Sequence, residues 1–357
     1  MEAEPRAGLS IAPMMNYTDR HFRYIMRVMT KRTRLYTEMI PADALLHGDP
    51  KRFLAYDTTE HPIALQLGGS DPKKLAQCAK IASDYGYDEI NLNVGCPSDR
   101  VSDGQFGACL MAKPYLVADC LAAMQRVTPV PITLKHRIGI DNRKIVTKKM
   151  LANNIEATLR LEQPDREAAH LVAYDDLHRF VGTVRQHSAC RTFIVHARIA
   201  ILGGLSPKDN RKIPPLRYPD VYRLKVDFPD CHIAINGGIR SIETISEHLH
   251  HIDEVMLGRV AYENPFLFSV VDKLLCKHAL SSREINNDSR NNNETNVGQI
   301  HVLADNVIAP EVIKIAESKK ITRHDVIQYT LQYVDRVMRD QVTTLTQAGQ
   351  TKAAHIL

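Results

Sequence analysis

The feature that most constrains the fold of this chain is the alternation of short β-rich runs with amphipathic stretches between residues 10 and about 270. We count eight such units, each pairing a strand pattern with a helical one. The predicted strands are SIAPM (10–14), RLYTEM (34–39), PIALQLGG (62–69), DEINLNVGCP (88–97), PITLKHR (131–137), TFIVHAR (192–198), HIAINGG (232–238) and EVMLGR (254–259). A doubly wound sheet would usually have fewer strands and a G-x-G-x-x-G motif, which is absent here. We therefore predict an α/β fold of the TIM (β/α)8 barrel class.

Two stretches interrupt this alternation. Residues 143–173 lie between the fifth strand and its helix, where about 2–6 residues would be ordinary, so we interpret them as an insertion that loops out. Residues 281–299 are rich in asparagine and poor in apolar residues, which predicts a disordered linker between a barrel over 1–280 and a small helical module over 300–357. The positions of that module predicted to face inward are Val326, Leu331, Val334 and Val337.

Composition narrows the class of protein. No run of about 18 apolar residues occurs, and MEAEPRAGLS lacks the layout of a secretory signal, so we expect a cytoplasmic protein, with an organellar address left open. The seven cysteines form no C-x-x-C pair and no zinc-type spacing, so we expect free thiols and no metal. A net charge of +5 suits a polyanionic partner, although many proteins this basic bind no nucleic acid. We expect a monomer.

Reactive side chains gather at the carboxyl ends of the predicted strands, where barrel enzymes place their active sites. These residues are Pro13 and Met14, Gln66, Asn93 and Cys96, Lys135 and Arg137, His196 and Arg198, Asn236 to Gly238, and Gly258 and Arg259. Each has a structural alternative, such as a rim lysine, a histidine bound to a carbonyl or a glycine in a turn. Seven strand ends that all carry such residues favour a catalytic site.

The loops after the last two strands predict a phosphate-bearing cofactor, because barrels commonly bind phosphate there. These loops read INGGI and LGRVAYENP, in which glycines let backbone N–H groups approach an anion and Arg259 can add a charged contact. Gln66 and Lys135 suit the pyrimidine edge and the N1–C2 region of a flavin. His196 could lie near the ring or the phosphate, or be a rim histidine satisfied by the backbone.

Cys96 is the candidate proton donor. It lies just beyond the fourth strand, between Gly95 and Pro97. An ordinary cysteine thiol is mostly protonated at neutral pH and can give a proton while a flavin gives hydride to the other carbon of a double bond. The alternative is a small buried thiol, which we assume for four other cysteines. These are Cys109, Cys120, Cys190 and Cys231.

Eight segments carry a resemblance to a known family. They are APMMNYTDRHFR, LQLGGSDP, EINLNVGCPSDRVSDGQFGACLM, KHRIGID, HAR, GLSPKDNRKIPPL, INGGI and MLGRVAYENP. Together they resemble the tRNA-dihydrouridine synthases of the A type, over roughly residues 9–275 without the insertion. NVGCPSDRV and GLSPKDNR are the most specific of them.

The resemblance implies an enzyme that holds FMN, reduces it with NADPH or NADH, and saturates the C5–C6 bond of a D-loop uridine at position 20 or 20a of tRNA. Cys96 would give the proton to C5 and reduced FMN the hydride to C6. The implied FMN ligands are Pro13, Met14, Met15, Gln66, Lys135, His196, Asn236, Gly237, Gly238, Gly258 and Arg259. The implied tRNA contacts are Asn93, Lys208 and Arg211. A solvated charged loop is the alternative for the last two.

Such a reaction requires the uridine to leave its stack and enter the barrel mouth. The basic residues expected to hold the RNA backbone there are Arg100, Arg137, Arg198, Lys208 and Arg211.

Three departures from the family pattern support alternatives. Ile199 replaces a lysine, the insertion enters near Lys135, and the chain ends in TLTQAGQTKAAHIL where relatives continue into a basic helix, so the tRNA-binding module is expected to be truncated or diverged. These departures favour a catalytically weak or inactive tRNA-binding protein. A separate alternative is an FMN-dependent reductase of small molecules, against which GLSPKDNR and NVGCPSDR argue.

Overall fold

The computed structural model describes residues 8–97, 106–141, 170–202, 204–270 and 323–347. Eight parallel strands close into a barrel in the order β1-β11-β10-β8-β5-β4-β3-β2. They are β1 (Leu9–Ile11), β2 (Arg34–Pro41), β3 (Ile63–Gly68), β4 (Glu89–Val94), β5 (Ile132–Arg137), β8 (Thr192–His196), β10 (His232–Asn236) and β11 (Glu254–Leu257). Each overlaps one predicted strand, so the prediction of a (β/α)8 barrel is confirmed.

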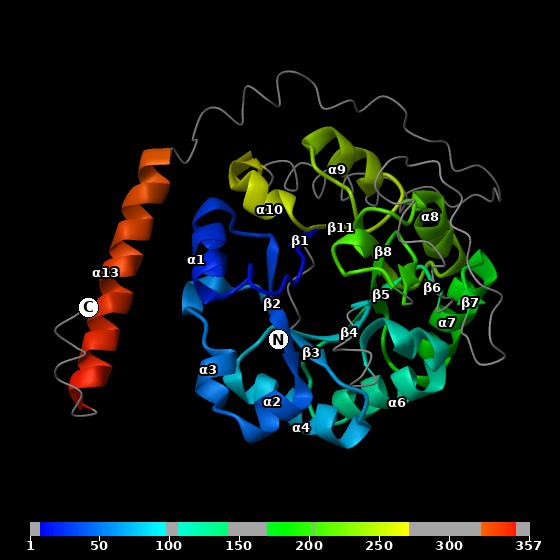
Figure 1. Cartoon of the computed structure of the whole chain (residues 1–357), viewed down its shortest axis with the longest axis horizontal. Coiled ribbons are helices and arrows are strands. Elements are labelled where there is room, and N and C mark those ends of the chain that lie inside the picture. The colour runs from blue at the N-terminus through cyan, green and yellow to red at the C-terminus, as the bar shows by residue number, and fades with distance from the viewer. Residues whose placement is uncertain (1–7, 98–105, 142–169, 203, 271–322, 348–357) are drawn as a thin grey trace, which may run out of the picture. The chain divides into compact units, whose positions relative to one another are not determined.

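Helices cover the outside of these strands (Figure 1). They are α1 (Arg20–Met29), α2 (Ala42–His47), α3 (Pro50–Leu54), α4 (Pro72–Tyr85), α6 (Pro114–Gln125), α7 (Tyr174–His187), α8 (Tyr218–Asp227), α9 (Ile242–Leu249) and α10 (Val260–Glu263). Local chemistry sets their ends. In α4, Asp71 accepts hydrogen bonds from Lys73 N and Lys74 N, and Gly86 ends the helix with a φ of 96°.

Side chains alternate between the two faces of the barrel wall. Outward residues such as Leu65, Leu134 and Val195 are fully buried beneath the helices. One apolar layer inside the barrel comprises Ala12, Tyr36, Ala64, Ile194, Ala234 and Met256, and Met14 packs against it. Because both faces are buried, the strands read as nearly continuous apolar runs. Polar residues near the strand ends are therefore the exceptions that mark a site.

Near its end, the predicted insertion (143–173) contains a strand that is part of a small sheet, so the described structure shortens that insertion at its end. Strand β6 (Ile140–Asp141) pairs antiparallel with β7 (His170–Leu171) and parallel with β9 (Ala200–Ile201). Gly139 permits this pairing, since a Cβ there would lie 2.1 Å from the Leu171 carbonyl oxygen. The segment 142–169 itself lies outside the described residues, so the expectation that it loops out stays a prediction.

The chain divides into two compact units, one comprising 1–23 with 32–264 and the other 24–31 with 265–357. In the second, α13 (Arg323–Gln347) is the described part of the predicted helical module, and Tyr333 stacks on Tyr24 with ring centroids 4.0 Å apart. The predicted linker over 281–299 lies outside the described residues.

The predicted inward face of α13 was only partly right. Val326 and Tyr333 are buried and Val337 is half-buried, whereas Leu331 and Val334 are 57% and 47% exposed. Residues 326 and 333 are seven positions apart, and residues 333 and 337 are four apart, so all three share one face of the helix. Leu331 does not lie on that face. The apolar stripe is therefore narrower than the sequence pattern suggested.

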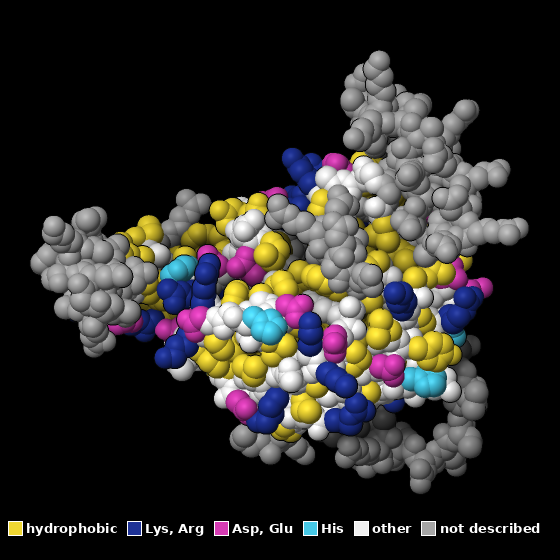
Figure 2. Space-filling view, turned by 60° about the horizontal axis from the view of Figure 1, so that its bottom comes forward, with side chains coloured by type: hydrophobic (Ala, Val, Ile, Leu, Met, Phe, Trp, Pro, Cys, Tyr) yellow, Lys and Arg dark blue, Asp and Glu magenta, His cyan; other side chains and the backbone are white. Residues whose placement is uncertain are grey.

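The described residues match neither a membrane-spanning helix nor, on the face that Figure 2 shows, a surface of one charge sign. None of their helices is both long enough and apolar enough to span a bilayer. On the face drawn in Figure 2, basic and acidic side chains are interspersed among apolar ones. The net charge of +5 is therefore not gathered on that face into a patch of one sign.

Candidate active site at the carboxyl end of the barrel

The barrel brings the predicted residues of four neighbouring strands, β4, β5, β8 and β10, to one end. Asn93 pairs in register with Lys135, and His196 pairs with both Arg137 and Asn236. Lys135 Nζ donates to Asn236 Oδ1 over 3.3 Å, although β8 separates their two strands. The lysine therefore reaches across the barrel mouth rather than along its wall.

Three basic groups crowd this mouth. Burial and then the neighbouring Arg137 lower the pKa of Lys135 to about 8. Burial, followed by the charges of Arg137 and Lys135, holds the pKa of His196 well below its ordinary value. His196 Nδ1 is buried and has no hydrogen-bond partner among the described residues. A region with excess positive charge and an unpaired nitrogen is suited to an anionic ligand.

The loop after β10 requires glycine at two positions. Gly237 and Gly238 have φ angles of 120° and 76°, in the region that side chains disfavour. A Cβ on Gly238 would lie 2.6 Å from Leu216 Cδ1, and the Tyr218 hydroxyl fixes the loop by donating to the Gly237 carbonyl over 2.7 Å. The backbone of Gly237 and Gly238 therefore carries no side chains, and Gly237 lies close to His196.

The loops after β1 and β11 leave more open space. A Cβ on Gly258 would meet only Met14 Sδ, 4.0 Å away, and Arg259 is exposed. Pro13 and Met14 are half-buried, and Met15 is 54% exposed. All the predicted ligand positions of these two loops therefore lie at the same end of the barrel as Lys135.

Cys96 lies on a turn that its neighbours hold in place. Asn93 Oδ1 accepts hydrogen bonds from Gly95 N and Cys96 N, both at 3.0 Å. Arg137 Nε donates to the Gly95 carbonyl over 2.9 Å, and Ala108 N donates to the Cys96 carbonyl over 2.9 Å. The Cys96 side chain is half-buried and so remains accessible from the mouth.

Of the five other described cysteines, four are buried, but Cys109, which we expected to be buried as well, is not. Cys120, Cys190 and Cys231 are buried, as expected for packed thiols, and burial raises the pKa of the first two to about 12. Cys109 is half-buried, and its thiol donates to the Phe106 carbonyl over 3.2 Å. Accessibility at the mouth therefore distinguishes Cys96 from the buried thiols.

The three residues predicted to touch RNA have different surroundings. Lys208 and Arg211 are exposed around the turn Asp209–Arg211. Asn93 is 9% exposed, and its carboxamide already bonds Gln66 and the Cys96 turn. Buried Asn210 anchors the loop through hydrogen bonds with the backbone of Ile201. We did not predict this anchor, which only the fold makes visible.

Arg137 corrects one expectation. We placed it among the cations that hold RNA, but it is 3% exposed and donates to the carbonyls of Gly95, Ile199 and Asn210. Its guanidinium therefore ties three loops together instead of facing solvent. Arg198 likewise donates to the Pro214 carbonyl, and Arg100 lies outside the described residues.

Two exposed aromatic side chains were missed. Tyr17 and Tyr262 are 45% and 58% exposed, and their rings meet edge to face at 4.9 Å. They follow the ends of β1 and β11, so the signal was present in MNYTD and VAYEN. Exposed aromatic rings are common platforms for unstacked bases.

Comparison with known proteins decides the family. The model of the dihydrouridine synthase (Dus) family matches residues 10–158 and 171–351. The chain belongs to the dihydrouridine synthase family. The gap in this match falls within the predicted insertion, and the second matched segment includes α13.

Relatives within the dihydrouridine synthase family are close in sequence. A tRNA-dihydrouridine(20/20a) synthase of Synechocystis sp. is 56% identical over 265 residues, which cover 74% of this chain and 71% of the relative. Proteins of the same name from Vibrio vulnificus and Pseudomonas putida are 53% and 52% identical, covering 75% and 76% of this chain and 73% and 72% of the relatives.

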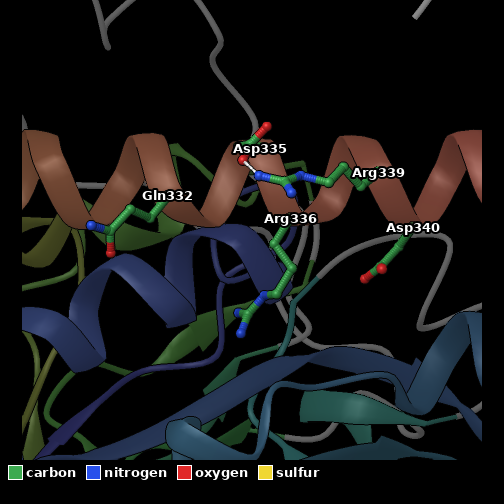
Figure 3. Close-up of a pocket in the computed structure, with 5 residues that line it drawn as sticks. All are labelled: Gln332, Asp335, Arg336, Arg339 and Asp340. Carbon is green, nitrogen blue, oxygen red and sulfur yellow. Dashed lines mark hydrogen bonds and ion pairs between the residues drawn. The ribbon is translucent and has the colours of Figure 1, made fainter.

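A depression of about 380 Å³ on α13 is lined by Gln332, Asp335, Arg336, Arg339 and Asp340 (Figure 3). Asp335 and Arg339 pair with each other there. Within the described part of the chain, no group of three or more His, Cys, Asp or Glu side chains could hold a metal ion.

Proposed function

We propose that the chain is an FMN-dependent tRNA-dihydrouridine synthase that reduces the C5–C6 bond of a D-loop uridine, at position 20 or 20a, with NADPH or NADH as the reductant. The observation that carries this proposal is the meeting of Lys135, His196 and Asn236 with an accessible Cys96 at one barrel mouth. Relatives above 50% identity bear the name of this activity.

The residues at the mouth fit FMN. An anion bound at this mouth would give the unpaired His196 Nδ1 a hydrogen-bond partner. It would also offset the positive charge that, together with burial, lowers the pKa of Lys135. Gln66, Asn236 and the bare backbone of Gly237 and Gly238 offer polar groups for the ring and the phosphate. The remaining ligands in this proposal are Pro13, Met14, Met15, Gly258 and Arg259.

Cys96 is the proposed acid. Reduced FMN, when bound, supplies the hydride that adds to C6 of the uracil ring. Cys96 gives its thiol proton to C5, so one hydride and one proton together saturate the double bond. Lys135 would supply positive charge to the N1–C2 region of a bound flavin, which carries negative charge when the ring is reduced. The turn fixed by Asn93 and Arg137 holds the thiol over the mouth.

The substrate enters this site as a base turned out of the tRNA stack. Lys208 and Arg211, both exposed, would bind phosphates without reading sequence. Tyr17 and Tyr262 offer aromatic surface near the same end of the barrel. Asn93, with one amide hydrogen uncommitted, remains a proposed tRNA contact through that hydrogen.

Turnover on tRNA tests the proposal. The purified protein should show a flavin spectrum and form dihydrouridine on unmodified tRNA with NADPH. Cys96→Ala should keep the flavin and lose at least about a hundredfold in turnover, as expected when a proton donor is removed. Cys109→Ala, which removes another half-buried thiol, is the matched control and should stay near wild type.

Three other outcomes would redirect the proposal. Bound flavin without dihydrouridine formation would favour an inactive tRNA-binding relative. Reduction of free uracil or an enone, but not of tRNA, would favour a small-molecule reductase. Full activity in Cys96→Ala would remove Cys96 from the mechanism.

A further inference from the structure

A continuous chain of hydrogen bonds runs through the barrel interior from the amino end of β4 to the Cys96 turn. Its members are Glu89, Thr133, Asn91, Gln66, Asn93 and the backbone N–H groups of Gly95 and Cys96. Every side chain in it is buried, with at most 9% of its surface exposed. Neither the family resemblance nor the catalytic proposal assigns a role to Glu89, Thr133 or Asn91.

The Glu89 end dictates the direction of the first donor. Glu89 lies 3.4 Å from Arg34 and accepts hydrogen bonds from the Tyr36 hydroxyl and from Thr133 Oγ1, the latter over 2.7 Å. A paired carboxylate only accepts, so the single hydroxyl hydrogen of Thr133 is used here. Thr133 then has only lone pairs to offer Asn91, which must present Nδ2, at 2.8 Å.

The direction is transmitted through three amides. With Nδ2 turned to Thr133, Asn91 presents Oδ1 to Gln66, whose Nε2 donates over 2.8 Å. Gln66 Oε1 is left to accept from Asn93 Nδ2 over 2.9 Å, and Asn93 Oδ1 faces the turn. Each step follows from the one before, because an amide that shows its nitrogen to one side shows its oxygen to the other.

The turn end requires the same direction independently. The backbone N–H groups of Gly95 and Cys96 can only donate, so Asn93 must show them its oxygen. Reversing any one amide would place two donors or two acceptors face to face in a buried site, at roughly 1–3 kcal/mol for each unmet group. The two ends therefore impose one orientation on every amide between them.

We propose that Glu89, Thr133 and Asn91 are positioning residues that fix the orientation of the Gln66 and Asn93 amides. This inference rests on the proposed function. Gln66 uses one amide hydrogen and one oxygen lone pair inside the protein, which leaves one of each for the flavin. The same chain ends at the Cys96 turn, so a change at Thr133 alters both the flavin edge and the acid.

Thr133→Val tests the inference, because valine keeps the shape of threonine and removes the hydroxyl. Thr133→Ser retains the hydroxyl and is the conservative rescue. Thr128→Val is the matched control, since it removes another buried threonine hydroxyl, which accepts from Val130 N over 3.0 Å outside the chain of amides. Glu89→Gln is a second variant, in which an amide that can donate or accept no longer dictates direction.

Three measurements on the purified proteins report the orientation of the Gln66 and Asn93 amides: FMN binding, tRNA turnover and Cys96 alkylation. Thr133→Val should bind FMN about tenfold more weakly and shift the visible spectrum of the bound flavin. It should also lower kcat about tenfold while KM for tRNA stays within about twofold. The rate of Cys96 alkylation by iodoacetamide, followed by peptide mass spectrometry against Cys109, should change at least about threefold. Glu89→Gln should move each quantity in the same direction as Thr133→Val.

Thr133→Ser and Thr128→Val should match wild type in every readout. A Thr133→Val protein with wild-type FMN affinity, flavin spectrum and Cys96 alkylation would overturn the inference. A Thr133→Ser protein as impaired as Thr133→Val would also overturn it, because the loss would then come from packing and not from the hydroxyl. If wild type binds FMN but makes no dihydrouridine, the proposed function fails, while FMN affinity, spectrum and alkylation still decide this inference.

Discussion

Replacing Lys135 by methionine should stabilise the protein when FMN is absent. Burial and Arg137 lower the pKa of this lysine from 10.5 to about 8. At about 1.36 kcal/mol per pKa unit, keeping it charged below pH 8 costs the folded state roughly 3 kcal/mol. Methionine removes that cost and also loses the hydrogen bond to Asn236, worth roughly 1 kcal/mol. We expect a net gain of about 2 kcal/mol at pH 7.

The stabilisation by Lys135→Met should depend on pH, and the lowered pKa fixes the direction of that dependence. Between pH 8 and 10.5 the unfolded chain still binds a proton on Lys135 that the folded chain has released, so the stability of wild type rises with pH in that window. The advantage of Lys135→Met should therefore be largest below pH 8 and shrink towards pH 10. Urea unfolding of FMN-free wild type and variant, followed by circular dichroism at pH 7 and pH 9.5, measures both values.

Binding of FMN should make wild type more stable than Lys135→Met. An anionic ligand favours the charged lysine, so wild type should gain more melting temperature from saturating FMN than Lys135→Met does. Wild-type affinity for FMN should fall as the pH rises above 8, and the affinity of the variant should not. A variant that is no more stable at pH 7, or whose advantage persists unchanged at pH 9.5, would refute the electrostatic account.

Two further substitutions test the loops around the mouth. Gly238→Ala should cost roughly 1–3 kcal/mol and weaken FMN binding, because φ is 76° and the new Cβ would lie 2.6 Å from Leu216 Cδ1; Gly258→Ala, with nothing nearer than 4.0 Å, is the control for melting temperature. Arg137→Met should lower the free energy of unfolding by at least about 2 kcal/mol, since three carbonyls lose a charged donor. An Arg137→Met protein as stable as wild type but defective in RNA binding would restore our original expectation for that residue.

The barrel and the grouping of its polar ends could be predicted because both follow from periodicity. Parallel strands covered on both faces read as apolar runs, and their carboxyl ends meet at one end of a barrel. The pairing of Asn93 with Lys135, and of His196 with Asn236, is a direct consequence of this geometry. Ordinary alternation also explains why β4 turns Asn91 inward two residues before Asn93.

The orientation of individual side chains could not be predicted in the same way. The carbonyls that engage Arg137 belong to residues 95, 199 and 210, which lie 42 to 73 positions away in sequence. Whether a guanidinium at a strand end binds loops or faces solvent depends on such distant partners. In α13, apolar content alone did not show that the buried stripe runs through Tyr333 and leaves Leu331 exposed.

The distribution of charge inside the barrel differs between its two ends. At the amino ends of the strands, acids are paired, Glu89 with Arg34 at 3.4 Å and Glu254 with His232 at 3.0 Å.

At the carboxyl ends, the charges that shift the pKa of Lys135 and His196 include other bases and no carboxylate. The folded chain therefore bears an electrostatic cost at the end where the reaction is proposed to occur. Among the neighbouring groups that shift these two pKa values, Cys96 alone acts in the opposite direction, by raising the pKa of Lys135. A ligand that brings negative charge, as FMN does through its phosphate and its reduced ring, removes this cost on binding. Under the proposed function, part of the binding free energy of FMN would therefore come from relief of the repulsion among these basic groups.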